Sequence, residues 1–174
     1  MPQVREMTTA DIDAVSALRV AGWQSAYAGI VPQPYLDAMT AEADALRRRE
    51  RLALSRPRTT DLVAVADGDT DGVPVGWACL GPSRDEAARP DTAELYALYA
   101  RPDLIGTGIG RALLTTAHSR ARTQHFTSIT LWVLAANHPA RLFYERAGYR
   151  PDGATQDDVY TDTTLTELRY TSAL

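Results

Sequence analysis

The stretch RPDLIGTGIGR, residues 101–111, decides the fold of this chain. Pro102 ends a preceding strand, and Gly106, Gly108 and Gly110 follow at alternate positions, where the backbone can turn tightly and approach a ligand because no Cβ is in the way. A helix begins at once, so its free N–H groups and the positive end of its dipole point out of the loop. This combination is typical of a pyrophosphate-binding site.

Two other interpretations of the glycine stretch compete with this one. A tight strand-to-helix turn without any ligand would use the same glycines. A Rossmann dinucleotide site has the spacing G-x-G-x-x-G near the first strand of a βαβ unit, with an acidic residue about 20 residues further on. Here the spacing is G-x-G-x-G at mid-chain, and residues 128–131 read Ser-Ile-Thr-Leu. The Rossmann interpretation therefore fails on spacing and context.

A second stretch, NHPARLFYERAGY at residues 137–149, follows in the downstream part of the chain. With it the chain resembles the GCN5-related N-acetyltransferase (GNAT) family. The family's cofactor motif, Gln/Arg-x-x-Gly-x-Gly/Ala, aligns with residues 105–110. Its N-x-x-A-x-x-F-Y-x-x-x-G-F/Y segment is matched at every defined position of the second stretch. The similarity continues through the strand at 93–100 and into the final strand.

The resemblance implies an α/β fold of the α+β kind, in a single domain over residues 1–174. We expect a central mixed, mostly antiparallel sheet of about seven strands, flanked by about four helices. The sheet would splay between its fourth and fifth strands to admit the pantetheine arm of acetyl-CoA, the implied cofactor. No metal is required.

The resemblance also assigns residues to acetyl-CoA, residue by residue. Backbone groups of the fourth strand would bond the arm, amides of the loop and helix start would bind the pyrophosphate, and the second stretch would flank the arm. The assigned residues are Leu98, Tyr99, Ala100, Leu104, Ile105, Gly106, Thr107, Gly108, Ile109, Gly110, Arg111, Asn137, Ala140, Phe143 and Tyr144.

Two positions depart from the family pattern. Ile105 stands where the family usually has Gln or Arg, and we expect weaker but not lost binding because most phosphate contacts there come from the backbone. Ala135 stands where many relatives of this branch have Glu in Leu-Glu-Ala-Asn, so a role for that Glu cannot be carried over to this chain.

Acetyl transfer to an amine needs a base and an acid. An alkyl ammonium with a pKa near ~10.4 is almost unreactive at neutral pH until it loses a proton. Glu94, on the strand that borders the cofactor, is the candidate base, directly or through a water; a surface carboxylate is the alternative. Tyr144 is the candidate acid for the departing thiolate, because a phenol can donate a proton and recover it. A strand N–H near Leu98 would meet the oxyanion.

The rest of the chain shows helical and strand periodicities in turn. We expect strands at 3–7, 62–66, 73–80, 93–100, 127–134, from 149 onward and at 166–170; helices from an N-cap at Thr8 or Thr9 to Tyr27, at 35–54, 108–122 and 140–147; and a hairpin turn at 67–72. Strict alternation would place Glu94, Tyr96, Leu98 and Ala100 on one face of their strand. A polar loop containing Asp157 and Asp158 would precede the last strand.

Aromatic residues of the opening helices are candidates for an acceptor pocket. They are Trp23, Tyr27 and Tyr35, joined by Tyr96 from the fourth strand; core packing is the alternative for each. The arginine-rich run at 47–51 fits a solvated helix face better than a phosphate site.

Composition excludes several classes of function. All 18 Lys+Arg residues are arginine, which removes a Schiff-base lysine and a P-loop lysine. The net charge of -4 argues against nucleic acid as the main partner. The single Cys79 rules out an internal disulfide and fits a cytoplasmic protein, and no signal peptide or membrane span is apparent.

Three functions remain open. The first is acetyl-CoA-dependent transfer to a primary amine of a small molecule. The second is the same reaction on a protein N-terminus or lysine. The third is an acyl-CoA-binding or sensing domain without turnover. Many members of the family are dimers, and the sequence does not decide whether this chain is a homodimer.

Overall fold

The computed structural model describes residues 1–68 and 72–174. The strands are β1 (Gln3–Glu6), β2 (Thr60–Val65), β3 (Pro74–Pro82), β4 (Thr92–Ala100), β5 (Ser128–Leu134), β6 (Arg150–Tyr160) and β7 (Thr163–Ala173). The α-helices are α1 (Ile12–Ala26), α2 (Gln33–Asp37), α3 (Ala41–Leu52), α4 (Ile109–Thr123) and α5 (His138–Arg146). The centre of the predicted hairpin turn, residues 69–71, lies outside the described residues.

The strands form one seven-stranded sheet in the order β1-β2-β3-β4-β5-β7-β6. Every neighbouring pair is antiparallel except β4 and β5, which are parallel. β4 and β5 pair only over residues 92–94 and 128–130, although both strands continue beyond that point. The predicted mixed, mostly antiparallel sheet with a splay between the fourth and fifth strands is confirmed, with five helices instead of about four.

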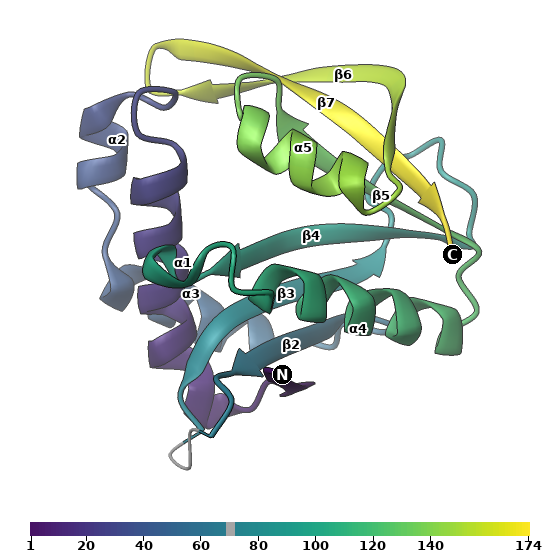
Figure 1. Ribbon diagram of the computed structural model, residues 1–174. Coiled ribbons are helices and arrows are strands. Elements are labelled where there is room, and N and C mark those ends of the chain that lie inside the picture. The colour runs from purple at the N-terminus through teal and green to yellow at the C-terminus, as the bar shows by residue number, and fades with distance from the viewer. Residues whose placement is uncertain (69–71) are drawn as a thin grey trace.

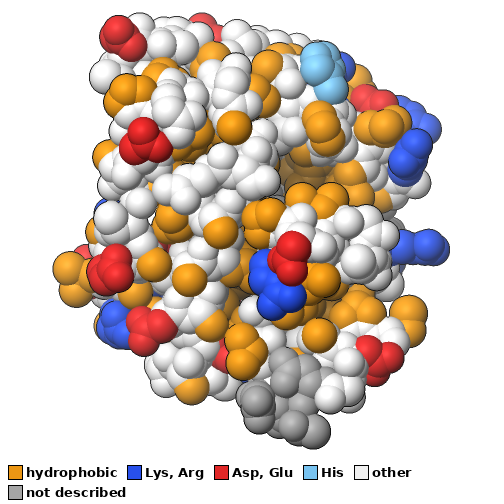
Figure 2. All heavy atoms as spheres, turned by 60° about the vertical axis from the view of Figure 1, so that its left-hand side comes forward, with side chains coloured by type: hydrophobic (Ala, Val, Ile, Leu, Met, Phe, Trp, Pro, Cys, Tyr) orange, Lys and Arg blue, Asp and Glu red, His pale blue; other side chains and the backbone are white. Residues whose placement is uncertain are grey.

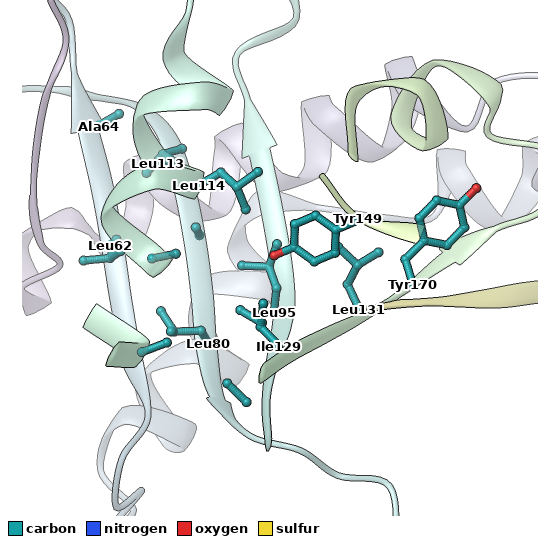
Figure 3. Close-up of a cluster of buried hydrophobic side chains, with 14 of the residues drawn as sticks. Leu62, Ala64, Leu80, Leu95, Leu113, Leu114, Ile129, Leu131, Tyr149 and Tyr170 are labelled. Carbon is teal, nitrogen blue, oxygen red and sulfur yellow. The ribbon is translucent and has the colours of Figure 1, made fainter. Parts of the chain in front are cut away.

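Helices cover both faces of this sheet (Figure 1). On one face lie α4 and α5, and on the other lies α1 with α3 against it. The main core is under α4 and α5: Leu113 and Leu114 point at side chains of β2 to β5, and Tyr149 and Tyr170 continue the same layer (Figure 3). α4 comes close to β3 because residue 76 is glycine; a Cβ there would lie 2.6 Å from Ile109 Cγ2.

The helical region expected at 35–54 is two helices. Thr40 lies between them with extended backbone, and its side chain accepts a hydrogen bond from Ala43 N at 3.2 Å, which caps α3. Such a cap satisfies one of the free N–H groups of a first helical turn. The prediction of a continuous helix was therefore wrong at this residue.

The arginine run at 47–51 is not a uniformly solvated face. Arg48 is 1% exposed, lies 4.2 Å from the ring of Trp77, and donates to Asp44 Oδ2 at 3.1 Å. Arg49 instead pairs with Asp13 near the surface. The expectation was wrong at Arg48 because α3 packs across α1, which buries the side of α3 that carries this residue.

A β-bulge corrects the predicted faces of β4. Leu95 pairs with Leu80 and Ala97 with Cys79, so Tyr96 is the extra residue. Leu98 and Ala100 consequently pack on the α4–α5 side, whereas Tyr99 packs on the α1 side. The prediction that Glu94, Tyr96, Leu98 and Ala100 share one face was wrong, because a bulge reverses the alternation beyond it.

The last hairpin is longer than expected. Asp157 and Asp158 lie in β6, paired with Thr166 and Leu165 of β7, and not in a loop. Their polarity fits a strand at the edge of the sheet, where charged side chains discourage pairing with another chain.

Candidate active site

The glycine loop forms an exposed shelf at the start of α4. A short 3₁₀ turn (Pro102–Leu104) leads into it, and Gly106 and Gly108 have φ of 87° and 97°, in the region that glycine tolerates best. Thr107 Oγ1 donates to Leu104 O at 2.6 Å, which holds the turn. Gly108 is the N-cap of α4, so the first N–H groups of the helix open onto the loop.

Ile105 is 69% exposed. An aliphatic side chain at the rim of this loop adds no charge for a phosphate, so any binding there falls to the backbone amides and the helix dipole.

The edge of β4 that faces β5 is unpaired from residue 95 onward. On its other edge β4 remains paired with β3 up to Ala100. Backbone groups along residues 95–100 are therefore available to an extended ligand, which could bond to them as a neighbouring strand would.

α5 brings the second motif to this edge from the α4 side. Asn137 caps α5 through Oδ1, which accepts from Ala140 N at 3.3 Å, and this bond leaves its amide nitrogen available to donate to a ligand. Phe143 lies beside Gly110 and Leu98: a Cβ built on Gly110 would be 3.4 Å from Phe143 Cζ and 3.7 Å from Leu98 Cδ2. The loop, β4 and α5 thus meet at one point.

Tyr144 stands next to this junction and close to the gap. Its ring centroid is 5.2 Å from that of Phe143 and 5.7 Å from that of Tyr149. Burial raises the pKa of Tyr144 well above its ordinary value, and the nearby Tyr99 adds to the increase. The phenol is therefore protonated at neutral pH, although burial makes it a weaker acid than a tyrosine in water.

On the opposite face of the sheet, Tyr99 and Tyr27 approach each other, with their hydroxyl oxygens 3.4 Å apart. Burial raises the pKa of both, and the charge of Tyr144 contributes to the effect at Tyr27. Tyr144 and Tyr27 therefore approach Tyr99 from different faces of the splayed sheet.

Glu94 is on the α1 side of β4 and is 1% exposed. Its carboxylate accepts from the backbone N–H of Arg84 at 2.8 Å and from the guanidinium at 3.1 and 2.5 Å. Most of its acceptor positions are occupied, so an acceptor amine would reach it only through a mediating group.

Three of the four predicted acceptor residues come together. The Trp23 ring lies 4.7 Å from that of Tyr27 and 6.3 Å from that of Tyr35. Tyr96 is separate: its hydroxyl donates to Pro82 O, and Arg84 lies 4.6 Å from its ring.

Sequence reasoning missed Tyr160, whose ring lies 5.2 Å from that of Tyr35 and 6.2 Å from that of Trp23. The polarity of residues 157–158 predicts a loop. Recognising residues 156–160 as a strand would have indicated that Tyr160 lies on a fixed face of the sheet, the same face as Asp158. The indole Nε1 of Trp23 is buried without a hydrogen-bond partner among the described residues. The Trp23 side chain is close enough to the Tyr99 hydroxyl to lower the pKa of Tyr99, against the larger effect of burial.

The molecular surface is hollowed on this side. Figure 2, turned so that the side of α1 and α2 comes forward, shows a depression lined by hydrophobic side chains. We call Trp23, Tyr27, Tyr35 and Tyr160 the aromatic group. A groove of about 450 Å³ adjoins this group. Its lining residues are Trp23, Tyr35, Met39, Arg19, Asp44, Arg47 and Arg51.

Residues 23–149 match the sequence profile of the acetyltransferase (GNAT) family. The chain belongs to the GNAT acetyltransferases. The matched region runs from the aromatic residues of α1 to the end of the second motif, and so includes both faces of the splay. The predicted family is confirmed.

Similar proteins agree with this assignment. A probable N-acetyltransferase of Mycobacterium tuberculosis is 27% identical over 154 residues, 88% of this chain and 82% of that protein. A mycothiol acetyltransferase of Propionibacterium freudenreichii is 36% identical over 123 residues, which are 71% of this chain but only 37% of that protein. The PaiA N-acetyltransferase of Thermoplasma acidophilum, solved in complex with coenzyme A, has the same fold with a TM-score of 0.73 at 19% identity over 100% of this chain and 99% of that chain.

As a GNAT N-acetyltransferase the chain uses acetyl-CoA, and its own residues fit this cofactor. The shelf at Gly106 and Gly108 suits a pyrophosphate, and the unpaired edge of β4 suits the amide-bearing pantetheine arm. No group of three or more metal-ligating side chains occurs in the described part of the chain. Within the same residues, no helix is long and apolar enough to cross a membrane.

Proposed function

We propose that this GNAT enzyme transfers the acetyl group of acetyl-CoA to a primary amine of a small molecule, by direct attack in a ternary complex. The observation that carries the proposal is the end of pairing between β4 and β5, with the glycine loop and Tyr144 on one face and Trp23, Tyr27 and Tyr160 on the other. Donor and acceptor can approach one gap from opposite faces, so no covalent enzyme intermediate is needed.

The proposed roles follow from position and protonation. Bound acetyl-CoA supplies an acetyl group activated as a thioester. The N–H groups of residues 106–111 hold its phosphates, and residues 98–100 hold its arm. Tyr144 Oη carries the proton that the departing sulfur requires, because this side chain packs beside Phe143 where the glycine loop, β4 and α5 meet. A backbone N–H near Leu98 stabilises charge on the carbonyl oxygen. Glu94 acts as base through a water, given its contacts with Arg84.

A small acceptor is favoured by the closure of the second face. Val31, just before α2, and Leu36 of α2 pack with Leu134 and Tyr160, so α2 and the β6–β7 hairpin meet at the end of the splay. An extended peptide would have to pass this contact, whereas a small amine could be held in the groove beside it. The similarity to mycothiol acetyltransferases is consistent with a small-molecule acceptor.

Two alternatives remain testable. Transfer to a protein N-terminus or lysine keeps the same donor site and changes only the acceptor. A sensing domain without turnover would retain acetyl-CoA binding, and Ile105 and Ala135, which depart from the family pattern, are the features that favour it.

The experiment is to add acetyl-CoA to the purified protein with a panel of amines and peptides, and to follow thiol release. Amine-dependent release supports the proposal, and release driven only by peptides supports the protein acceptor. Tight acetyl-CoA binding by calorimetry without release supports the sensor. Absence of acetyl-CoA binding would contradict the assignment of the loop.

Replacing Tyr144 tests the proposed acid. We expect Tyr144→Phe to lower kcat by ~10²–10⁴, the usual contribution of a general acid, with the Kd for acetyl-CoA nearly unchanged. Tyr170→Phe is the matched control, because it removes the same atom from a hydroxyl that contacts Arg141 and Glu145. Equal loss of kcat in both variants would mean that Tyr144 acts only through packing.

A further inference from the structure

One carboxylate borders the splay on the face where the acceptor would enter. Glu167 lies on β7, paired with Leu134 of β5 on one side and Gln156 of β6 on the other. Its neighbour Leu165 packs with the aromatic group, whereas Leu168 packs in the core under α4 and α5. Because side chains alternate along a strand, Glu167 faces the same side as Leu165.

Among the described residues Glu167 has no ion-pair partner, which it shares with Asp158 on the same face of the hairpin. The charge of Glu94 is met by Arg84, and Arg169, two residues along β7, pairs with Asp85 and Asp152. None of the ion pairs among the described residues includes Glu167. Gln156 Nε2 donates a hydrogen bond to Glu167 Oε2 at 2.6 Å. Within residues 1–68 and 72–174, the other carboxylate oxygen accepts no hydrogen bond from a side chain.

The surroundings of Glu167 suit a positive charge. Burial raises the pKa of Glu167, and the charges of Asp158 and Glu94 add to this effect, while Arg84 and the Gln156 hydrogen bond oppose it. The negative charge of Glu167 in turn raises the pKa of Tyr99 and Tyr160. Glu167 is thus close to Tyr99 and Tyr160, and the nearby Asp158 adds negative charge on the same face.

We propose that Glu167 is the anionic group that receives the ammonium of the acceptor, which makes the acceptor a cationic amine with no carboxylate beside the amino group. This inference rests on the proposed function. The ammonium of the acceptor would donate to the second carboxylate oxygen of Glu167. The apolar part of the acceptor would lie against the rings of Trp23, Tyr35 and Tyr160, and the faces of these rings also attract the ammonium. A carboxylate on the adjacent carbon would be repelled by Glu167 and Asp158.

The test compares Glu167→Gln with Asp157→Asn. The glutamine keeps an oxygen for the Gln156 hydrogen bond and removes only the charge. Asp157 lies on the same hairpin, on the opposite face, and pairs with Thr166. Asp157→Asn therefore removes the same charge from the side that does not face the acceptor. The acceptors are the best amine of the panel and two matched pairs, tyramine with tyrosine and phenethylamine with phenylalanine.

We expect the wild-type enzyme to prefer the amine over the amino acid in each pair. Glu167→Gln should lower kcat/KM for the amines by ~10- to 100-fold, mostly through KM, the usual effect of removing a charge-assisted hydrogen bond. The ratio of kcat/KM for the amine to that for the amino acid should decrease in Glu167→Gln. Asp157→Asn should have the same ratio and the same kcat/KM as the wild-type enzyme. Thermal melting and the Kd for acetyl-CoA should be unchanged in both.

The outcomes separate this inference from the proposed function. If the wild-type enzyme acetylates amines and Glu167→Gln matches it, the assignment of Glu167 is overturned and the proposed function stands. The same holds if the wild-type enzyme prefers the carboxylate-bearing partner of each pair. If the wild-type protein binds acetyl-CoA but acetylates no amine, the proposed function fails and the assignment of Glu167 fails with it.

Discussion

Gly108 allows a prediction that separates backbone strain from steric clash. It caps α4 with φ of 97°, and a Cβ added there would have no heavy atom within 4 Å. The substitution Gly108→Ala therefore introduces no collision. Its whole effect comes from holding an L-residue in a left-handed conformation, or from the loop relaxing out of it.

The expected magnitude has two parts. Holding the conformation costs ~1–2 kcal/mol of stability, or a decrease of ~2–8 °C in Tm for a domain of this size. If the loop relaxes, the N–H groups at the start of α4 lose their alignment with the cofactor phosphates. Loss of one charge-assisted hydrogen bond would weaken acetyl-CoA binding by ~10- to 100-fold.

The assay pairs thermal melting with calorimetric titration of acetyl-CoA, and Gly153→Ala serves as the control. Gly153 has φ of 92° and is equally free of neighbours, but it lies in β6 and not in the loop. Both variants should melt at a lower temperature, and only Gly108→Ala should bind acetyl-CoA more weakly. If Gly108→Ala shows no decrease in Tm, the loop has relaxed, and an unchanged affinity for acetyl-CoA would then refute the placement of the phosphates on this loop.

Two further predictions concern groups outside the reaction. Cys79 is buried, and burial raises the pKa of its thiol to about 12, so the native protein should not react with Ellman's reagent until guanidinium unfolds it; fast reaction of the native protein would contradict this placement. Asp11 accepts hydrogen bonds from Arg5 and Thr8, which lower its pKa to about 2. Because the folded-state pKa is depressed, the stabilisation is present above the unfolded pKa of ~3.9 and is lost as pH falls toward 2. Asp11→Asn should cost ~1–2 kcal/mol at neutral pH, and its Tm should approach that of wild type in acid, measured by melting from pH 7 to 2; a constant difference in Tm would contradict the pKa assignment.

The sequence by itself determined the features that depend on short-range chemistry. The positive φ of Gly106 and Gly108, the helix that starts after them, and the cap at Asn137 are all dictated by a few adjacent residues. These local features also carry the family motifs, so the family, its cofactor and the splayed sheet could be predicted before the structure.

Only the tertiary structure decided which side chains meet across the sheet. The bulge at Tyr96 separates Glu94 from the face of Leu98, and it arises from pairing with β3, which no periodicity within β4 reveals. Arg48 is buried because α3 packs on α1 above Trp77. Glu167 borders the splay because β7 lies between β5 and β6. In each case the partner is distant in the sequence, and the free energy of the contact depends on packing that a local pattern does not contain.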